Sequence, residues 1–214
     1  MRIKAFVFDC GGVLLRDGDE SRYRHWEKRL GLLEGELKRR LWTGELWTRA
    51  ERGDLSEAEF WSRAGEELGL SADRQIERLA RDLWDSWHID EEVLGAIDET
   101  RQRYRVAMLS NASDALEEQL AERYGVADRF ELIVNSSREG VAKPEAEIYR
   151  ILLDRMELEA EQVVFIDDRP ENVSAAAELG MHVIWFVGAR ELWRQLAGYL
   201  AGDSDDAEDL EQRD

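Results

Sequence analysis

The stretch FDCGGVL, residues 8–14, sets one carboxylate and two glycines directly after a run that is typical of a buried strand. That run, RIKAFVF over residues 2–8, is rich in β-branched and aromatic side chains. Glycine lets the backbone come close to a ligand because it has no Cβ. A single acid after a strand can also be a plain helix cap, so the interpretation of Asp9 depends on which residues stand at the ends of the other strands.

Strand and helix patterns alternate through most of the chain. Short apolar runs recur at residues 106–110 (VAMLS), 132–136 (LIVNS), 163–167 (VVFID) and 182–187 (HVIWFV). Helical patterns lie between them, with recognisable starts at Ser113, Pro144 and Pro170. This alternation predicts an α/β fold with a doubly wound parallel sheet, in which these runs are buried strands.

Residues 16–89 break the alternation and show helical patterns only. Ser56 and Glu59 are spaced as a capping box, and another helix start lies near Ser71. We therefore expect a helical subdomain inserted between the two parts of a core, residues 1–15 and 90–200. Most of its tryptophans are expected to form its own core, and about one or two to line a pocket facing the main domain. Six of the eight tryptophans fall in it, namely Trp26, Trp42, Trp47, Trp61, Trp84 and Trp87.

Composition narrows the classes of partner. The formal net charge of -19 argues against binding to nucleic acid or to anionic membranes, both of which require a basic protein surface. No apolar run approaches the roughly 20 residues that a membrane-spanning helix needs. The start MRIKAF lacks the pattern of a secretory signal. We expect a cytoplasmic protein, and nothing in the sequence indicates its oligomeric state.

Two further features have plain interpretations. The single cysteine, Cys10, cannot form an internal disulfide or share a metal with a second thiol, so we expect an unreactive packing residue. Residues 201–214 are strongly acidic and offer almost nothing apolar to pack. We expect them to form a solvated, disordered tail.

The residues at the ends of the predicted strands share one kind of chemistry. The carboxyl ends of parallel strands meet at one edge of the sheet, so side chains from different strands converge there. Carboxylates bind Mg²⁺ or act as nucleophiles, whereas lysine, serine and asparagine bind phosphate oxygens. Each alone has a simpler explanation as a cap, a turn residue or a surface lysine. Together they predict a site for a phosphoryl group held by a divalent cation. The set consists of Asp9, Ser110, Asn111, Lys143, Asp167 and Asp168.

Four segments together resemble the motifs of the haloacid dehalogenase superfamily of phosphotransferases, in their usual order. They are FDCGGVL, the run ending in Ser110-Asn111, the segment Lys143-Pro144-Glu145, and FIDDRPEN from residue 165. The resemblance implies the Rossmann-like core of that superfamily, and residues 16–89 resemble its inserted α-helical cap. GELWTRAERGDLSEAEF, residues 44–60, is similar to caps in the sugar-phosphate branch, which includes glucose-1-phosphate phosphatases.

The resemblance implies a Mg²⁺ cofactor and a set of ligands for it. Asp9 would be both the nucleophile and a metal ligand. Gly11 would bind the metal through its backbone carbonyl, and Asp168 would be the further ligand from the protein. Asp167 would lie beside the metal and assist in holding it.

The resemblance also implies how the phosphate is held. Ser110, Asn111 and Lys143 would bind its oxygens, with Lys143 counted among the catalytic residues. Asn172, in the first turn of the helix after FIDDRPEN, would steady that loop.

The chain departs from the phosphatases of the superfamily at one position. They usually carry a second aspartate two residues after the nucleophile, which protonates the leaving oxygen, and this chain has Gly11 there. General acid and base help is typically worth a factor of about 10²–10⁴ in rate. Its loss matters least for good leaving groups, such as those of anomeric phosphates, acyl phosphates and diphosphates.

The leading hypothesis is a Mg²⁺-dependent phosphatase that hydrolyses a small phosphorylated metabolite, such as a sugar phosphate, through an aspartyl-phosphate. The alternative is a protein of the same fold that binds a phosphorylated ligand or regulates a partner. Such a protein would have lost efficient hydrolysis, and the glycine at position 11 in place of the usual aspartate would be the sign of that loss. Haloacid dehalogenation is disfavoured, because the dehalogenases typically have tyrosine at that position and do not need the metal-binding acids Asp167 and Asp168.

Overall fold

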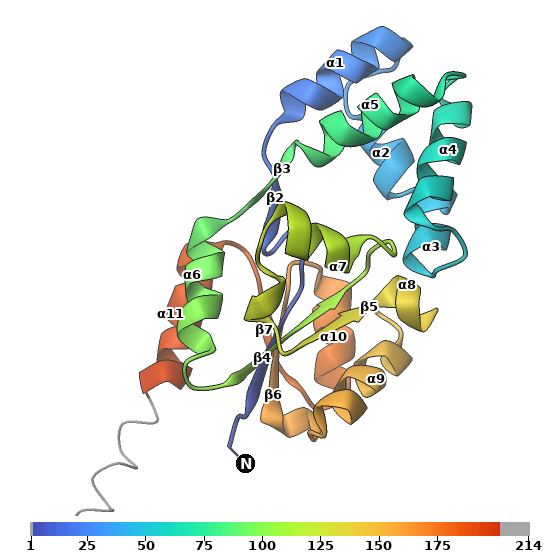
Figure 1. Cartoon of the computed structure of the whole chain (residues 1–214). Helices are drawn as coiled ribbons and strands as arrows, with labels where there is room; N and C mark the ends of the chain where they lie inside the picture. Colours follow the sequence, from blue (N-terminus) through green and yellow to red (C-terminus); the bar gives the residue numbers. More distant parts are fainter. Residues whose placement is uncertain (1, 202–214) are drawn as a thin grey trace, which may run out of the picture.

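A computed structural model describes residues 2–201, and its centre is a five-stranded parallel sheet (Figure 1). The strands stand in the order β5-β4-β1-β6-β7, and all neighbours are parallel. The chain runs outward from β1 through β4 to β5 and then returns to β6 on the other side of β1. The predicted doubly wound sheet is therefore confirmed. The strands are β1 Ala5–Phe8, β4 Arg105–Ser110, β5 Leu132–Asn135, β6 Val163–Asp167 and β7 His182–Trp185.

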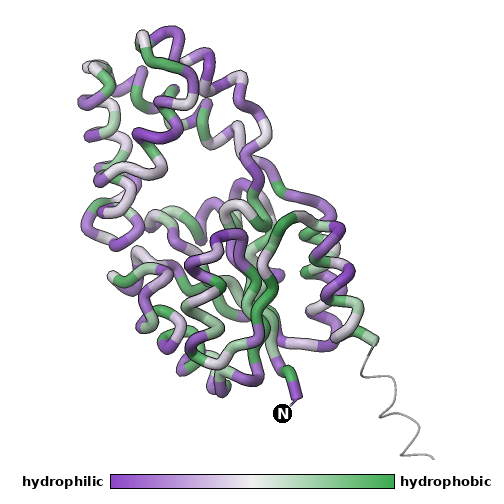
Figure 2. The backbone as a smooth tube through the Cα atoms, turned by 180° about the vertical axis from the view of Figure 1, so that it is seen from behind, coloured by the Kyte–Doolittle hydropathy of each residue, from purple (hydrophilic) through white to green (hydrophobic). Residues whose placement is uncertain are grey.

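Helices cover both faces of the sheet, which explains why its strands are apolar almost without interruption. Along β1, Phe6 and Phe8 belong to the apolar cluster on the side of α6 and α11, whereas Ala5 and Val7 belong to the cluster on the side of α9 and α10. Figures 1 and 2 show these helices on the two sides and the hydrophobic strands between them. The covering helices are α6 Glu91–Thr100, α9 Ala146–Met156, α10 Pro170–Glu178 and α11 Ala189–Ala201.

Five further helices lie beyond one end of the sheet, within residues 16–89, which we call the insertion (Figure 1). They share an apolar cluster of their own, in which Trp26 and Phe60 are fully buried. The expected capping box is confirmed: the Ser56 N–H donates to the Glu59 carboxylate at 2.9 Å, and the Glu59 N–H donates to the Ser56 hydroxyl. The helices are α1 Glu20–Leu30, α2 Glu36–Trp42, α3 Glu45–Glu51, α4 Glu57–Glu67 and α5 Asp73–Trp84.

A short antiparallel ribbon joins the insertion to the core. β2 (Leu15–Asp17) pairs with β3 (Trp87–Ile89), in a region where the sequence predicted helices only. Strands of three residues are too short to show alternation, so the helical prediction was wrong at both ends of the insertion. The division of the chain at residues 15 and 90 stays a prediction.

Two of the three predicted helix starts in the core are wrong. Ser113 donates its hydroxyl proton to Glu57 of the insertion, and the next helix, α7 (Leu116–Glu118), begins only after Ala115. A tertiary contact thus takes the side chain that was expected to cap. Pro144 lies before the first turn of α9, whereas Pro170 is the first residue of α10 as predicted. The remaining short elements are the π-helical turn η1 Gln119–Arg123, the 3₁₀ turns η2 Ala127–Arg129 and η3 Ala160–Gln162, and α8 Ser136–Glu139.

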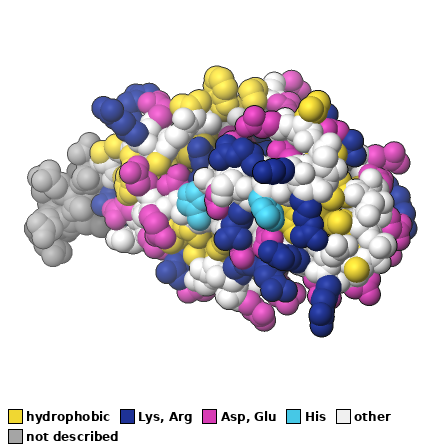
Figure 3. Space-filling view, turned by 90° about the horizontal axis from the view of Figure 1, so that it is seen from above, with side chains coloured by type: hydrophobic (Ala, Val, Ile, Leu, Met, Phe, Trp, Pro, Cys, Tyr) yellow, Lys and Arg dark blue, Asp and Glu magenta, His cyan; other side chains and the backbone are white. Residues whose placement is uncertain are grey.

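The surface carries both signs of charge. Figure 3 shows Lys and Arg side chains gathered in the middle of one face with Asp and Glu around them, so the net charge of -19 is not spread evenly. Within residues 2–201 no helix has the length and apolarity needed to cross a membrane. The acidic tail expected over residues 201–214 lies outside the described residues, apart from Ala201 at the end of α11.

Candidate active site

Functional side chains meet at the carboxyl edge of the sheet because three strands end there in register. β1 lies between β4 and β6, and its last residue, Phe8, is level with Met108 and Ile166. Asp9 comes directly after Phe8, and its N–H donates to the Ile166 carbonyl at 2.9 Å. Asp167, the next residue of β6, therefore stands beside Asp9.

The ammonium of Lys143 lies between these two carboxylates. Its Nζ donates to Asp9 Oδ1 and to Asp167 Oδ2, each at 2.7 Å, and to the Leu109 carbonyl at 2.8 Å. The side chain is only 1% exposed, so all three N–H donors are used inside the protein. The structure thus brings three of the predicted site residues, from three distant parts of the chain, into one buried cluster.

This cluster holds more negative charge than its one ammonium balances. Burial, assisted by the charge of Asp167, raises the pKa of Asp9 to about 7, although Lys143 acts in the opposite direction. Burial and the charge of Asp167 also raise the pKa of Asp168. Burial works against the charge of Lys143, yet Asp9 and Asp167 together raise its pKa. A second cation at this point would relieve the repulsion among the acids.

Three carboxylates can reach one cation here. One oxygen from each of Asp9, Asp167 and Asp168 lies within 4.8 Å of the others. Asp168 Oδ1 is buried and has no hydrogen-bond partner within residues 2–201, and a bound cation would satisfy it. Oxygen donors suit a hard cation such as Mg²⁺. The residues present therefore fit the metal that the sequence predicts.

The two glycines of FDCGGVL stand in different surroundings. Gly12 has a φ of +87°, and a Cβ built on it would lie 2.2 Å from Asp168 Oδ2, so only glycine lets this carboxylate approach. Within residues 2–201, no atom outside Gly11 and its two chain neighbours lies within 4 Å of the place that a Cβ of Gly11 would take, and Gly11 borders a cavity at this edge of the sheet. Close packing therefore explains Gly12 but not Gly11.

Two asparagines hold the charged cluster in position. Asn172 donates its side-chain amide to both oxygens of Asp167, at 3.0 and 3.1 Å, which agrees with the steadying role predicted for it. Asn111 Nδ2 donates to the Lys143 carbonyl at 2.9 Å, and its Oδ1 accepts from the Lys143 N–H at 2.8 Å. Asn111 thus fixes the Lys143 segment, and the phosphate contact that the resemblance implies would share atoms that are already engaged.

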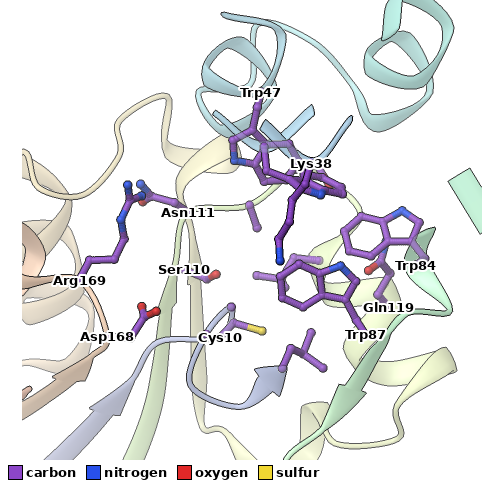
Figure 4. A pocket seen from close by; sticks show the side chains of 17 residues that line it. Cys10, Lys38, Trp47, Trp84, Trp87, Ser110, Asn111, Gln119, Asp168 and Arg169 are labelled. Atoms are coloured by element: carbon purple, nitrogen blue, oxygen red, sulfur yellow. The ribbon is translucent and has the colours of Figure 1, made fainter. Parts of the chain in front are cut away.

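The cavity, of about 340 Å³, opens between this edge of the sheet and the insertion (Figure 4). Gly11, Ser110 and Asp168 line it on the side of the sheet. The volume lies within the range of about 300–1,000 Å³ that is common for small-molecule sites. The wall on the side of the insertion consists of Lys38, Trp42, Trp47, Trp84 and Trp87.

Four tryptophans line the cavity, more than the one or two expected. All four are half-buried, whereas Trp26 and Trp61 are buried in the core of the insertion. The predicted number was too low because an apolar helical pattern does not indicate which side chains turn toward the sheet. Lys38 was also missed, since a lysine on a short helix carries no signal of its own.

Cys10 borders the cavity, but its surroundings keep the thiol unreactive. The side chain is buried, and burial raises the pKa of the thiol far above its usual range. Since the thiolate is the reactive form, Cys10 behaves as the packing residue that the sequence predicted.

Comparison with known proteins identifies the family to which this arrangement belongs. A family profile described as haloacid dehalogenase-like hydrolase matches residues 3–180. A sesquiterpene phosphatase from Aspergillus oryzae is 29% identical over 179 residues, which cover 83% of this chain and 87% of the relative. A drimenol cyclase from Aspergillus calidoustus is 26% identical over 209 residues, which cover 95% of this chain but only 38% of the relative.

A solved structure shows the same fold in a protein with bound ligands. It is a HAD family enzyme from Bacteroides thetaiotaomicron, an aspartate-to-alanine mutant in complex with magnesium and inorganic phosphate. The TM-score is 0.70 at 27% sequence identity, and the alignment covers 85% of this chain and 93% of that one.

We expect Gly12→Ala to weaken the binding of a divalent cation by about tenfold or more, because the new Cβ would displace Asp168. Gly11→Ala is the matched control, since its Cβ meets open space, and it should bind the cation as the wild type does. Titration calorimetry with Mg²⁺ measures both affinities, and thermal unfolding shows that both variants fold. Equal affinities in two folded variants would contradict this explanation of Gly12.

Proposed function

The chain belongs to the haloacid dehalogenase-like hydrolases, and we propose that it is a Mg²⁺-dependent phosphatase that acts on a small phosphorylated metabolite through an aspartyl-phosphate on Asp9. The observation that carries this proposal is the buried cluster of Asp9, Lys143 and Asp167, with the unpartnered Asp168 oxygen beside it. Asp168, beside this cluster, lines a cavity of suitable size. A relative that is named a phosphatase and matches over most of its length adds support.

In the proposed first step, a carboxylate oxygen of Asp9 attacks phosphorus, and the bond from phosphorus to the alcohol oxygen breaks with its electron pair on that oxygen. Lys143 occupies Asp9 Oδ1, so we assign the attack to Oδ2. Mg²⁺, when bound, would supply positive charge to the phosphate oxygens. In the second step water attacks the phosphorus of the aspartyl-phosphate, which releases inorganic phosphate and restores Asp9.

Gly11 decides which leaving groups suit this mechanism. The space beside it is open, so no residue of 2–201 brings a carboxyl group to the place where related phosphatases carry their second aspartate. The alcohol oxygen has to leave as a stable anion or with a proton from water, from the substrate itself or from a side chain of the insertion. Substrates with good leaving groups are therefore favoured.

Two other functions of the same fold compete with this proposal. Gly11 favours a protein that binds a phosphorylated ligand or regulates a partner without efficient turnover. Dehalogenation needs no cluster of metal-binding acids, and Asp9, Asp167 and Asp168 form one. The cluster therefore counts for the phosphatase and against the dehalogenase.

Two observations bear on the alcohol part of the substrate, and they favour different classes. The sequence of residues 44–60 resembles sugar-phosphate phosphatases, whereas the relative from Aspergillus oryzae is named for a sesquiterpene, which is an apolar hydrocarbon skeleton. The proposal of a phosphatase holds for either class of alcohol.

The direct test is a screen of phosphorylated metabolites with Mg²⁺, using release of inorganic phosphate as the measurement. We expect turnover by the wild type and a loss of more than about 10³-fold in Asp9→Asn, because an amide is neither a competent nucleophile nor a good metal ligand. Binding of a phosphorylated ligand without any turnover would favour the regulatory alternative. Retained turnover in Asp9→Asn would remove Asp9 from its role.

Metal binding should depend on pH. Because the pKa of Asp9 is raised to about 7 in the cation-free protein, Asp9 is protonated below that pH and Mg²⁺ has to displace the proton. We expect the dissociation constant for Mg²⁺ to rise about tenfold per pH unit below pH 7 and to level off above it. Calorimetry between pH 5.5 and about 8.5 measures it. An affinity that does not change with pH would contradict the raised pKa of Asp9 or its role as a ligand.

A carboxyl group placed at Gly11 should widen the range of leaving groups. In Gly11→Asp the new side chain enters open space, and it can donate a proton to the departing oxygen. We expect kcat/KM for simple alkyl phosphates to rise by about 10²-fold, and to change little for acyl phosphates, which leave without a proton. Gly11→Asn is the control that adds a side chain of the same size without the acid. A folded Gly11→Asp variant with an unchanged preference would refute this account.

A further inference from the structure

The wall of the cavity that faces the phosphate site is aromatic, and it carries an inference about the substrate. We propose that the site takes phosphate esters whose alcohol part is apolar, and that Trp42, Trp47, Trp84 and Trp87 select that part. The inference rests on the proposed phosphatase function, which supplies the phosphate end of the ligand. It goes further by choosing between the sugar and the hydrocarbon.

The four rings form one continuous surface. Trp42 lies in the middle, with ring centroids 4.9 Å from Trp47, 5.6 Å from Trp84 and 6.4 Å from Trp87. The contacts with Trp47 and Trp87 are edge-to-face, so the rings hold one another in fixed orientations. Figure 4 shows the labelled Trp47, Trp84 and Trp87 on the side of the cavity opposite Asp168. Such a wall offers apolar area that is already ordered before a ligand binds.

Two of the four indole N–H groups of this wall are engaged within the protein. Trp42 Nε1 donates to the Tyr23 hydroxyl at 2.8 Å, and Trp84 Nε1 donates to Glu57 Oε1 at 2.7 Å. Ser113 also donates its hydroxyl proton to Glu57. Trp87 Nε1 has no partner within residues 2–201, but it is buried, so a ligand cannot reach it. The hydroxyl groups of a sugar would therefore lose water here and find few partners in exchange.

The one cation of this wall is already neutralised. Lys38 Nζ lies 2.6 Å from Asp17 Oδ2, and the Asp17 side chain is only 7% exposed. The same ammonium lies 5.7 Å from the centre of the Tyr23 ring. A carboxylate or a second phosphate on the ligand would have to compete with Asp17 for it. The wall thus favours an alcohol part without charge.

Polar lining gathers at the opposite end of the cavity. Ser110, Asn111, Asp168 and Arg169 lie on the side of the sheet, next to Asp9 and Lys143. Ser113 and Gln119 also line the cavity, and both donate to Glu57. The cavity is therefore mainly polar at the sheet edge and mainly apolar at the tryptophans. A phosphate head at the sheet edge with a hydrocarbon or aromatic body against the tryptophans matches both ends, which a sugar phosphate does not.

The size of the effects separates the two classes of alcohol. Each methylene that leaves water for an apolar wall improves binding about fourfold when fully buried. Each hydroxyl that loses its water without a new partner weakens binding about tenfold. A phosphate ester with a chain of several carbons should therefore bind at this wall with an affinity that is orders of magnitude higher than that of a hexose phosphate of similar volume.

The test measures binding without turnover, using the wild-type protein with Mg²⁺ and straight-chain alkylphosphonates from methyl to octyl, whose carbon–phosphorus bond a phosphatase does not cleave. Calorimetry and the change in tryptophan fluorescence report the affinity. We expect it to rise about threefold to fourfold per methylene until the cavity is full, while glucose 1-phosphate competes no better than methylphosphonate. An affinity independent of chain length, or a stronger competition by glucose 1-phosphate, would overturn the inference.

A variant locates the effect on the wall. Trp47→Ala should weaken the binding of octylphosphonate by about tenfold or more and leave the affinity for methylphosphonate unchanged, because only the longer chain reaches that ring. Trp193→Phe is the control, because Trp193 of α11 packs against the core of the sheet domain and its Nε1 donates to the Glu92 carbonyl of α6. This substitution should change neither affinity. If Trp47→Ala is unstable, the chain-length series of the wild type still decides.

The outcomes separate this inference from the proposed function. Tight binding of octylphosphonate without hydrolysis of any phosphate ester would support the apolar pocket and contradict the phosphatase. Efficient hydrolysis of sugar phosphates, with no preference for longer alkyl phosphates in kcat/KM, would support the phosphatase and contradict the pocket.

Discussion

The buried ammonium of Lys143 is the interaction on which the rest of the site depends. It faces Asp9 and Asp167, two buried carboxylates that would otherwise repel each other. Its third hydrogen bond goes to the backbone of β4. The charge balance of the site therefore depends on the register of the strands. A shift of β1, β4 or β6 by one residue would remove a hydrogen-bond partner of the ammonium. The neighbouring residues serve the same balance: Asn111 fixes the Lys143 segment and Asn172 orients Asp167.

Residues at the carboxyl edge of the sheet could be predicted from the sequence, because each directly follows or ends an apolar run. A polar residue directly after an apolar run stands at the end of a strand, and parallel strands bring such ends together. Asp9, Ser110 and Asp167 were found in this way. The doubly wound sheet was predicted from the same alternation, and it is confirmed by the strand order.

The opposite wall could not be predicted, because it depends on how five helices pack. The sequence showed that tryptophans were concentrated in the insertion, but not that Trp47 and Trp84 turn toward the sheet while Trp26 turns inward. The cap predicted at Ser113 was wrong for the same reason, since its partner Glu57 lies 56 residues away in the chain. The short β2–β3 ribbon was missed because three residues carry no periodic signal.

Glu57 makes contacts both within the insertion and with the core. Its carboxylate accepts from Trp61 and Trp84 within the insertion and from Ser113 of the core, and its N–H donates to Asp114 of the core at 2.8 Å. One side chain thus both orients the aromatic wall and fastens the insertion to the sheet. Lifting the insertion away from the sheet would break the contacts of Glu57 with Ser113 and Asp114 but leave its bond to Trp84, so closure of the insertion decides where the aromatic wall stands and not whether it forms. By thermodynamic reciprocity, a ligand that fills the wall strengthens closure by as much as closure strengthens its binding.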